Sequence, residues 1–297
     1  MNVVIAGASG LIGTALVSAL KSRGDTVRRL VRHDPADDSE LQWHPESGEL
    51  DASSVEGVDA VICLSGKGIA DGRWTPRIKR EILESRVSTV ELLSRRIAEV
   101  SKPPAVFICA SAIGIYGTTN QEEAFDESSP PGDDFLSGVC SAWEEAAEMA
   151  RSVTRVVHAR LGVVLTPSRG ALARMLPVFR VGFGGPLGNG EQSMSWIALE
   201  DAVGAILHLM DDADVKGAVN VVAPNPVSNQ DFSHSLATAL HRPCWFRVPG
   251  FVIRLALGEM GEALLLNGAN VAPGVLERTG FHFVYPDIEQ VWESIFV

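Results

Sequence analysis

Three glycines near the start of the chain have the spacing of an anion-binding turn. Residues 3–5 (Val-Val-Ile) are apolar without alternation, which predicts a buried parallel strand, and Gly7, Gly10 and Gly13 follow it. A tight turn needs unusual backbone angles, a diphosphate needs close backbone approach, and helix–strand packing needs a position without Cβ. Because the N–H groups at the start of the next helix then face an anion, the stretch predicts a dinucleotide site.

A basic pair follows the second predicted strand. In dinucleotide sites the end of this strand meets the adenosine ribose, where an acid binds the 2′-hydroxyl of NAD and an arginine accommodates the 2′-phosphate of NADP. Arg32 and His33 occupy this place, and no carboxylate precedes Asp34. Arg32, with His33 beside it, is therefore our candidate for the 2′-phosphate. The alternative is a solvated basic edge that includes Arg28 and Arg29.

The end of the next buried strand, residues 59–64, is a second candidate contact. The carboxyl ends of parallel strands border the ligand crevice of an open α/β sheet. Leu64 and Ser65 are expected to contact the dinucleotide through their backbone, and Gly66 and Lys67 follow them. Lys67 is either a phosphate contact or an exposed side chain, and the sequence leaves both open.

The amino-acid composition indicates a globular protein and opposes several classes of partner. The chain has 297 residues, 46% hydrophobic and 21% charged, which is typical of a soluble globular protein with a sizeable core. Its net charge of −12 opposes nucleic acid and anionic membrane surfaces as main partners. The four cysteines form no Cys-x-x-Cys pair, so we expect packing roles, a reducing compartment and no metal site. The cytoplasm is the expected location, since no leader pattern precedes the first strand.

Strands and helices alternate along the chain, which predicts an α/β fold with a doubly wound parallel sheet. The predicted strands are 3–5, 26–31, 59–64, 105–110, 155–164 with an interruption at Gly162, 219–222 and 245–248. The predicted helices are 11–23, 75–100, 135–151, 169–181, 199–210 and 229–240, and short helices follow. Residues 34–57 are predicted to be a polar, turn-rich connection.

The order of these elements divides the chain. Residues 1–165 are expected to form the NADP-binding Rossmann-like domain, with part of 195–225 completing its sheet. Residues 166–297 are expected to form a smaller substrate-side lobe, with a helical segment at about 245–297. The second region contains a glycine-dense loop, 182–190, whose ordering is entropically costly. It is therefore expected to be mobile and to close over a substrate.

Motifs along nearly the whole chain resemble the extended short-chain dehydrogenase/reductases, in particular the epimerase-family branch often labelled nucleoside-diphosphate-sugar epimerases. The glycine spacing alone indicates only the superfamily, and the later motifs are more specific to the branch. They are Gly-Ala-Ser-Gly-Leu-Ile-Gly (7–13), Leu-Val-Arg (30–32), Glu-Ser-Arg-Val (84–87) with Thr89, Ser-Ala-Ile-Gly-Ile-Tyr-Gly (111–117), Gly-Gly-Pro-Leu-Gly-Asn-Gly (184–190), Ser-Trp-Ile (195–197), and Pro273 with Gly280-Phe281.

The resemblance implies a Rossmann-like fold that binds NADP(H), acting on an unknown small-molecule substrate as a monomer or homodimer. It implies coenzyme contacts from the glycine loop, the strand ends and the long helix. The coenzyme-binding residues are then Gly7, Ser9, Gly10, Leu11, Ile12, Gly13, Arg32, His33, Leu64, Ser65, Gly66, Glu81, Arg86, Ala110 and Val164. Ser111 falls near the family's Ser/Thr position, and Ala112 occupies the neighbouring position that the family motif could equally mean. Tyr116 is the tyrosine nearest the crevice, and its alternative role is a packed ring after a strand.

One departure from the family pattern bears on mechanism. The superfamily usually moves the substrate proton with a tyrosine whose pKa is lowered by a lysine four residues on, since a phenol alone titrates near pH 10. Position +4 is Asn120 after Tyr116 and Glu289 after Tyr285. The helix expected to carry the pair, residues 135–144, contains neither tyrosine nor lysine.

Three hypotheses therefore compete. The first is an NADP-dependent oxidoreductase or epimerase with a non-standard acid, either Tyr116 or a carboxylate such as Glu122, Glu123 or Asp126. The second is a non-catalytic NADP(H)-binding redox sensor or regulatory protein. The third is a scaffold without ligand, which the glycine loop disfavours.

Overall fold

The computed structural model describes residues 1–117 and 124–296, and its centre is an eight-stranded sheet. The strand order is β11-β7-β6-β5-β1-β2-β3-β4, and neighbouring strands are parallel except at the β3–β4 edge. The strands are β1 (Asn2–Ala6), β2 (Thr26–Val31), β3 (Glu40–His44), β4 (Glu49–Leu50), β5 (Ala60–Cys63), β6 (Val106–Ala112), β7 (Arg155–Leu161) and β11 (Gly217–Val221).

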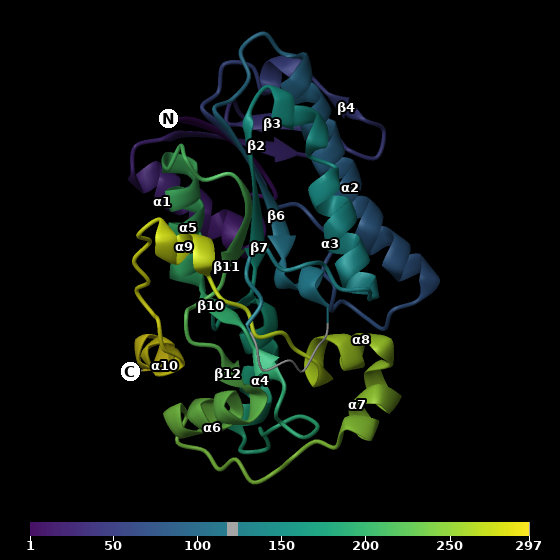
Figure 1. Ribbon diagram of the computed structural model, residues 1–297, viewed down its shortest axis with the longest axis vertical. Coiled ribbons are helices and arrows are strands. Elements are labelled where there is room, and N and C mark those ends of the chain that lie inside the picture. The colour runs from purple at the N-terminus through teal and green to yellow at the C-terminus, as the bar shows by residue number, and fades with distance from the viewer. Residues whose placement is uncertain (118–123, 297) are drawn as a thin grey trace.

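Helices cover both faces of this sheet, as the doubly wound fold requires. The helices are α1 (Leu11–Ser22) and α5 (Leu199–Asp211) on one face, and α2 (Pro76–Glu99) and α3 (Phe135–Glu145) on the other (Figure 1). The central strands are buried on both faces, which explains their unbroken apolar runs. Thr75 is the N-cap of α2, and its hydroxyl accepts a hydrogen bond from the Ile78 amide. Pro76 occupies the first turn of the helix, as the sequence predicts.

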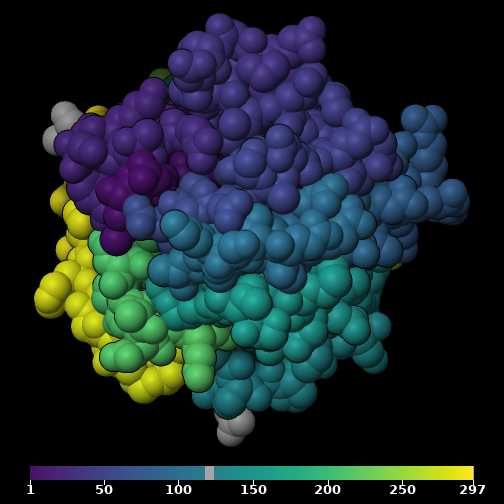
Figure 2. All heavy atoms as spheres, turned by 90° about the horizontal axis from the view of Figure 1, so that it is seen from above, coloured from purple at the N-terminus to yellow at the C-terminus, as the bar shows by residue number. Residues whose placement is uncertain are grey.

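A smaller lobe lies below the carboxyl ends of the central strands (Figure 1). Its helices are α4 (Gly170–Arg180), α6 (Asn229–Ala239), α7 (Gly250–Leu257), α8 (Glu259–Gly261) with a π turn at Glu262–Leu266, and α10 (Ile288–Phe296). Helix α9 (Gly274–Arg278) instead packs against β11 of the main sheet, beside α5 (Figure 1). Two small sheets pair β8 (Val163–Leu165) with β10 (Trp196–Ala198), and β9 (Ser193–Met194) with β12 (Val227–Ser228). Seen from above, the first half of the chain, coloured purple to teal, forms most of the visible surface (Figure 2). The domain division near residue 165 remains a prediction.

Two local predictions were wrong, at residues 34–57 and at residues 245–248. Residues 34–57 contain β3 and β4, in which buried Trp43 pairs with Leu50 across the hairpin, and two apolar side chains on one face were enough to anchor it. The interruption predicted at Gly162 is confirmed, because β7 ends at Leu161 and β8 begins at Val163, and a Cβ at Gly162 would lie 2.8 Å from the Ser195 carbonyl oxygen. Residues 245–248 form no strand, and Val248 makes only an isolated bridge to Leu187.

The glycines of loop 182–190 allow close backbone packing. A Cβ at Gly185 would lie 1.7 Å from the carbonyl oxygen of Phe246, so this approach requires glycine. The Leu187 amide donates to Asn229 Oδ1 (2.8 Å), and the Gly188 amide donates to the Val248 carbonyl (2.9 Å). These contacts oppose the expectation of a free lid.

We accordingly expect amide hydrogen exchange to find this loop anchored. The amides of Leu187, Gly188 and Gly190 all donate hydrogen bonds, so they should exchange far more slowly than unstructured amides without added ligand. Mass-spectrometric exchange of peptides covering 182–190, with peptides from β6 as the protected reference, measures this. Exchange at random-coil rates would restore the mobile lid.

Candidate functional site

The glycine loop has the geometry that its spacing predicts. Gly7 has φ +81°, and a Cβ there would lie 2.7 Å from the Leu64 carbonyl carbon. A Cβ at Gly13 would lie 2.2 Å from the Gly7 carbonyl oxygen, so α1 packs against the loop backbone only with glycine there. Gly10 is the N-cap of α1 and provides no side-chain cap, and the first turn carries no acid. The start of α1 can therefore accept an anion.

Arg32 and His33 lie at the same edge of the sheet as this loop. Ala6, the last residue of β1, pairs with Leu30 in β2. Arg32 and His33 therefore follow the end of β2 beside the glycine turn, which follows the end of β1. Arg32 Nη1 lies 3.0 Å from Glu46 Oε1, and both side chains are more than half exposed. Such an exposed ion pair is weak, so the guanidinium remains accessible to a phosphate. His33 Nδ1 lies 2.9 Å from the Asp34 carbonyl oxygen.

The end of β5 is tied to α2 by polar contacts. The Leu64 amide donates to the Ala6 carbonyl (2.9 Å), which places the Leu64–Gly66 stretch beside the glycine loop. Lys67 Nζ pairs with Glu81 Oε2 (2.9 Å), and Arg77 holds the other oxygen of the same carboxylate. Hydrogen bonds from Arg77 and Lys67 lower the pKa of Glu81. In this structure Lys67 and Glu81 therefore form an ion pair with each other.

Arg86 lies beneath the same strand end. Its Nη1 donates to the Ile82 carbonyl (2.9 Å), and its guanidinium lies 5.0 Å from the centre of the Trp143 ring. A Cβ at Gly66 would come within 3.3 Å of the Arg86 side chain. Burial lowers the pKa of Arg86, yet no carboxylate within the described residues forms an ion pair with it. A half-buried guanidinium without a carboxylate is suited to an anionic ligand.

The two residues predicted to be catalytic belong to a buried network. Ser111 donates to Glu144 Oε1 (2.7 Å), and Arg160 binds both oxygens of Glu144 (2.8 and 2.9 Å). Arg160 also donates to the Tyr116 hydroxyl (2.9 Å), which in turn donates to Asn220 Oδ1 (2.6 Å). Ser111 and Tyr116 are each 1% exposed.

This placement opposes catalytic roles for Ser111 and Tyr116, which stay predictions. Both hydroxyls lie inside the protein with their hydrogen bonds made, so neither faces the crevice. Burial raises the pKa of Tyr116 despite the nearby Arg160 charge, which makes the phenol a poorer proton donor. Among the proposed carboxylates, Asp126 accepts from Ser128 and Ser129 within its own turn. Glu122 and Glu123 lie outside the described residues.

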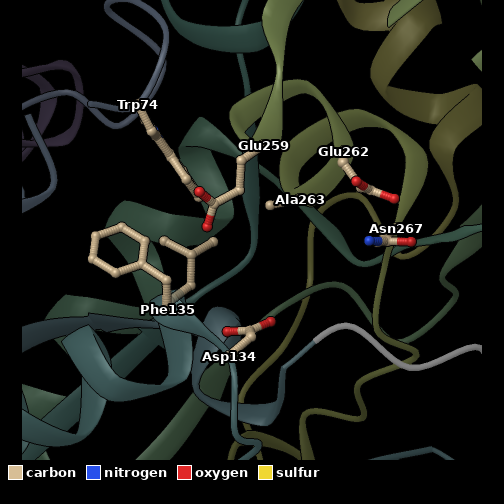
Figure 3. A pocket seen from close by; sticks show the side chains of 8 residues that line it. Trp74, Asp134, Phe135, Glu259, Glu262, Ala263 and Asn267 are labelled. Atoms are coloured by element: carbon tan, nitrogen blue, oxygen red, sulfur yellow. The ribbon is translucent and has the colours of Figure 1, made fainter. Parts of the chain in front are cut away.

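A cavity of about 150 Å³ opens between α3, the loop before α2 and the C-terminal helices (Figure 3). Trp74 and Phe135 form its aromatic wall, with ring centres 5.0 Å apart. Lys79 Nζ lies 4.7 Å from the centre of the Phe135 ring and 2.6 Å from Glu259 Oε1. The lining residues are Trp74, Asp134, Phe135, Leu136, Glu259, Glu262, Ala263 and Asn267.

Arg169 is a candidate that the sequence analysis did not single out. Its Nη1 donates to the Ser9 carbonyl in the glycine loop (3.0 Å), and it lines a second cavity of about 270 Å³ beside Leu11 and Thr14. The sequence signal that could have identified it is its position, directly before the predicted helix at 169–181 and shortly after a strand that ends at the crevice. No group of three or more His, Cys, Asp or Glu side chains that could hold a metal occurs in the described part of the chain.

The sequence model of the NAD dependent epimerase/dehydratase family matches residues 3–222. The chain belongs to this family. A second model, a domain of unknown function (DUF1731), matches residues 248–295. The resemblance to the extended short-chain dehydrogenase/reductases and the Rossmann-like fold are thereby confirmed.

Relatives of this epimerase-family protein are similar along its full length. An epimerase family protein of Mycobacterium bovis is 44% identical over 95% of this chain and 93% of its own. The chloroplastic SDR39U1 homologue of Arabidopsis thaliana is 38% identical over 99% of this chain and 86% of its own. A crystal structure of human SDR39U1 (isoform 2) with NADPH superposes with a TM-score of 0.91, at 32% identity and 99% coverage of both chains.

The structure of this family member brings together one part of the predicted site. The glycine loop, Arg32, His33 and the Leu64–Gly66 strand end share one edge of the sheet, and Arg86 lies beneath it. Val164 is in β8, which pairs with β10 outside the main sheet, and Ala110 is a buried position in β6. In the part of the chain that the structure describes, no helix is both long and apolar enough to cross a membrane.

Proposed function

We propose that this protein binds NADP(H) at the carboxyl edge of its central sheet and acts as an oxidoreductase or epimerase. The observation that carries the proposal is the turn at the open N-terminus of α1, where Gly7 and Gly13 leave no room for a Cβ. The human relative whose crystal structure contains NADPH shares the fold throughout. The alignment of both chains supports the same coenzyme here.

Three arginines fit the phosphates of this coenzyme. The diphosphate would lie against the backbone of residues 9–13, with Arg169 beside it. Arg32 would bind the 2′-phosphate, with His33 next to it. Arg86, half-buried and without a carboxylate partner among the described residues, would face the coenzyme from α2 together with Glu81. The structural fit therefore extends beyond the glycine spacing.

The cavity in Figure 3 is the proposed substrate site. When bound, the coenzyme supplies or accepts the hydride, and the chain must orient the substrate and exclude water. Trp74 and Phe135 provide an apolar wall, while Asp134, Glu259 and Glu262 supply carboxylates. Lys79, held between Phe135 and Glu259, is an ammonium close enough to this wall to act as a proton donor.

Thermal shift measurements test coenzyme binding without knowledge of the substrate. A coenzyme at about 100 times its dissociation constant should stabilise the fold by about 2.7 kcal/mol. NADPH should therefore raise the melting temperature clearly, and NADH at the same concentration should raise it less. The proposal fails if neither coenzyme shifts the transition.

Ordinary UDP-sugar 4-epimerase activity is expected to be negligible. The tyrosine and lysine of the usual acid/base pair are absent from α3, and the Tyr116 hydroxyl is buried. A coupled assay with UDP-glucose and the coenzyme-loaded protein measures the rate, with an epimerase that has the usual pair as the positive control. Turnover at about ten per second, a typical enzyme rate, would contradict this expectation.

A non-catalytic redox sensor is the second candidate. It rests on the same buried placement of Ser111 and Tyr116, because no Ser, Thr or Tyr is among the described residues that line the cavity beside Phe135. Absorbance at 340 nm distinguishes the two candidates. Substrate-dependent loss of NADPH absorbance over a panel of carbonyl compounds identifies an enzyme, whereas coenzyme binding without turnover over the panel favours the sensor.

The cellular setting is also proposed. We infer a cytoplasmic location, although one plant relative is named chloroplastic. We also infer a small-molecule substrate, no nucleic-acid partner and a monomer or homodimer. The division into a coenzyme domain, 1–165, and a substrate-side lobe, 166–297, belongs to this proposal.

A further inference from the structure

Exposed apolar side chains gather on the smaller lobe. Eight large apolar residues there are exposed; we call them the lobe patch: Val178, Val181, Phe183, Trp245, Phe246, Phe251, Val252 and Leu255. Its two segments touch, because the Phe183 and Phe246 rings lie 5.3 Å apart and Arg242 Nε donates to the Arg180 carbonyl (2.6 Å). Exposed apolar side chains gathered in this way indicate an interaction site.

Helix α7 exposes apolar side chains where a surface helix would ordinarily expose polar ones. Ile253 points inward and is 5% exposed, whereas Phe251 and Leu255 are 68% and 77% exposed. A surface helix ordinarily presents polar side chains to water, and α7 presents an aromatic ring and an aliphatic side chain. Trp245, 85% exposed, precedes it in the connection from α6. This connection and α7 form the lower end of the molecule in Figure 1.

The two segments that carry the lobe patch contain arginines but no acidic residues. Residues 170–190 and 241–258 contain five arginines and no Asp or Glu, although the whole chain has a net charge of −12. Two of these arginines pair with carboxylates of other segments, Arg174 with Asp71 and Arg254 with Glu262. The other three, which are Arg180, Arg242 and Arg247, are exposed and have no carboxylate partner among the residues that the structure describes.

We propose that the lobe patch docks on an anionic lipid bilayer. Aromatic and aliphatic side chains surrounded by arginines are the composition that binds a bilayer interface, where the rings enter the headgroup region and the cations meet lipid phosphates. The net charge of the chain does not prevent this contact, because charges beyond a Debye length of about 10 Å are largely screened. The protein lies on the membrane through this lobe without spanning it.

Two other occupants fit the patch less well. A two-fold contact between copies would bring Arg180, Arg242 and Arg247 of one copy against the same arginines of the other, and like charges oppose that pairing. Nucleic acid would use the aromatic rings for stacking, but Val181 and Leu255 offer it no stacking surface. A lipid bilayer satisfies both the aliphatic groups and the cations.

Vesicle sedimentation with the full chain tests the proposal. Wild type should bind phosphatidylcholine vesicles that contain about one-quarter phosphatidylglycerol, should release them in high salt, and should bind pure phosphatidylcholine weakly. The double variant Phe251→Glu/Leu255→Glu should bind the anionic vesicles at least about tenfold more weakly, since both side chains would enter the interface. Arg180→Gln should weaken binding about fivefold.

Val284→Glu is the matched control, because Val284 is 64% exposed but lies outside the patch. It should bind like wild type, and every variant should keep the NADPH thermal shift, which separates this proposal from coenzyme binding. Absence of wild-type binding to anionic vesicles at low salt would overturn the proposal. So would equal binding by the double variant, or a dimer in light scattering that the double variant dissociates without affecting vesicle binding.

Discussion

Arg32→Ala should remove most of the preference for NADPH over NADH. A guanidinium can make two charge-assisted bonds to the 2′-phosphate, and hydrogen bonds to charged groups contribute about 1.5–3 kcal/mol each. In the free protein Arg32 pairs with Glu46 at 3.0 Å, and an exposed ion pair of this kind is worth about 0–1 kcal/mol. The 2′-phosphate therefore displaces Glu46 from Arg32. We expect NADPH affinity to fall tenfold to about a hundredfold in the variant.

Two matched variants make the measurement specific. Glu46→Gln frees Arg32, so it should raise NADPH affinity by up to about fivefold without changing NADH affinity. Arg28→Ala removes a neighbouring arginine whose Nη2 reaches the Ser54 carbonyl at 3.4 Å, and it should leave the preference intact. Fluorescence titration with both coenzymes provides the dissociation constants. A preference that survives in Arg32→Ala would move the role to His33, and equal wild-type affinities would remove it altogether.

Parts of the fold and site that depend on local chemistry could be predicted from the sequence. The apolar strands, the Thr75 cap and the glycine turn are each decided by residues close together in the chain. The edge hairpin β3–β4 was missed because its core contribution is small, namely Trp43 and Leu50 within a polar segment. An edge strand needs few apolar residues, so alternation gives little signal there.

Contacts between distant segments explain why the sequence alone could not place Tyr116. Because Tyr116 follows a strand at the crevice, the sequence left both a proton donor and a packed ring open. Its burial depends on Asn220, 104 residues later, and on Arg160, and neither partner is marked by a pattern around Tyr116. The cavity likewise joins Trp74, Phe135 and Glu259 from three separate segments. Only the folded chain shows that these side chains meet.

Arg160→Met should be among the most destabilising single substitutions in this protein. Arg160 binds both oxygens of Glu144, and their side chains are only 9% and 14% exposed. Removing one member of a buried pair leaves an uncompensated charge, which costs about 3–5 kcal/mol of unfolding free energy. Glu144→Gln/Arg160→Met removes both charges and should recover part of that loss. Arg77→Met, at an 87% exposed side chain, should change stability by less than about 0.5 kcal/mol.

The pH dependence distinguishes loss of the ion pair from loss of packing. Burial acts to raise the pKa of Glu144, but the hydrogen bonds and charge of Arg160 outweigh it, so the pKa lies below 4.5. The pair therefore stabilises the fold above the unfolded pKa, and this stabilisation is lost as the pH falls through the folded value. Without Arg160, burial dominates and the Glu144 pKa rises, so protonation in acid relieves the unpaired charge. The stability difference between wild type and Arg160→Met should thus shrink between pH 7 and about pH 4 in urea unfolding. A difference that is equal at both pH values would assign the effect to lost packing.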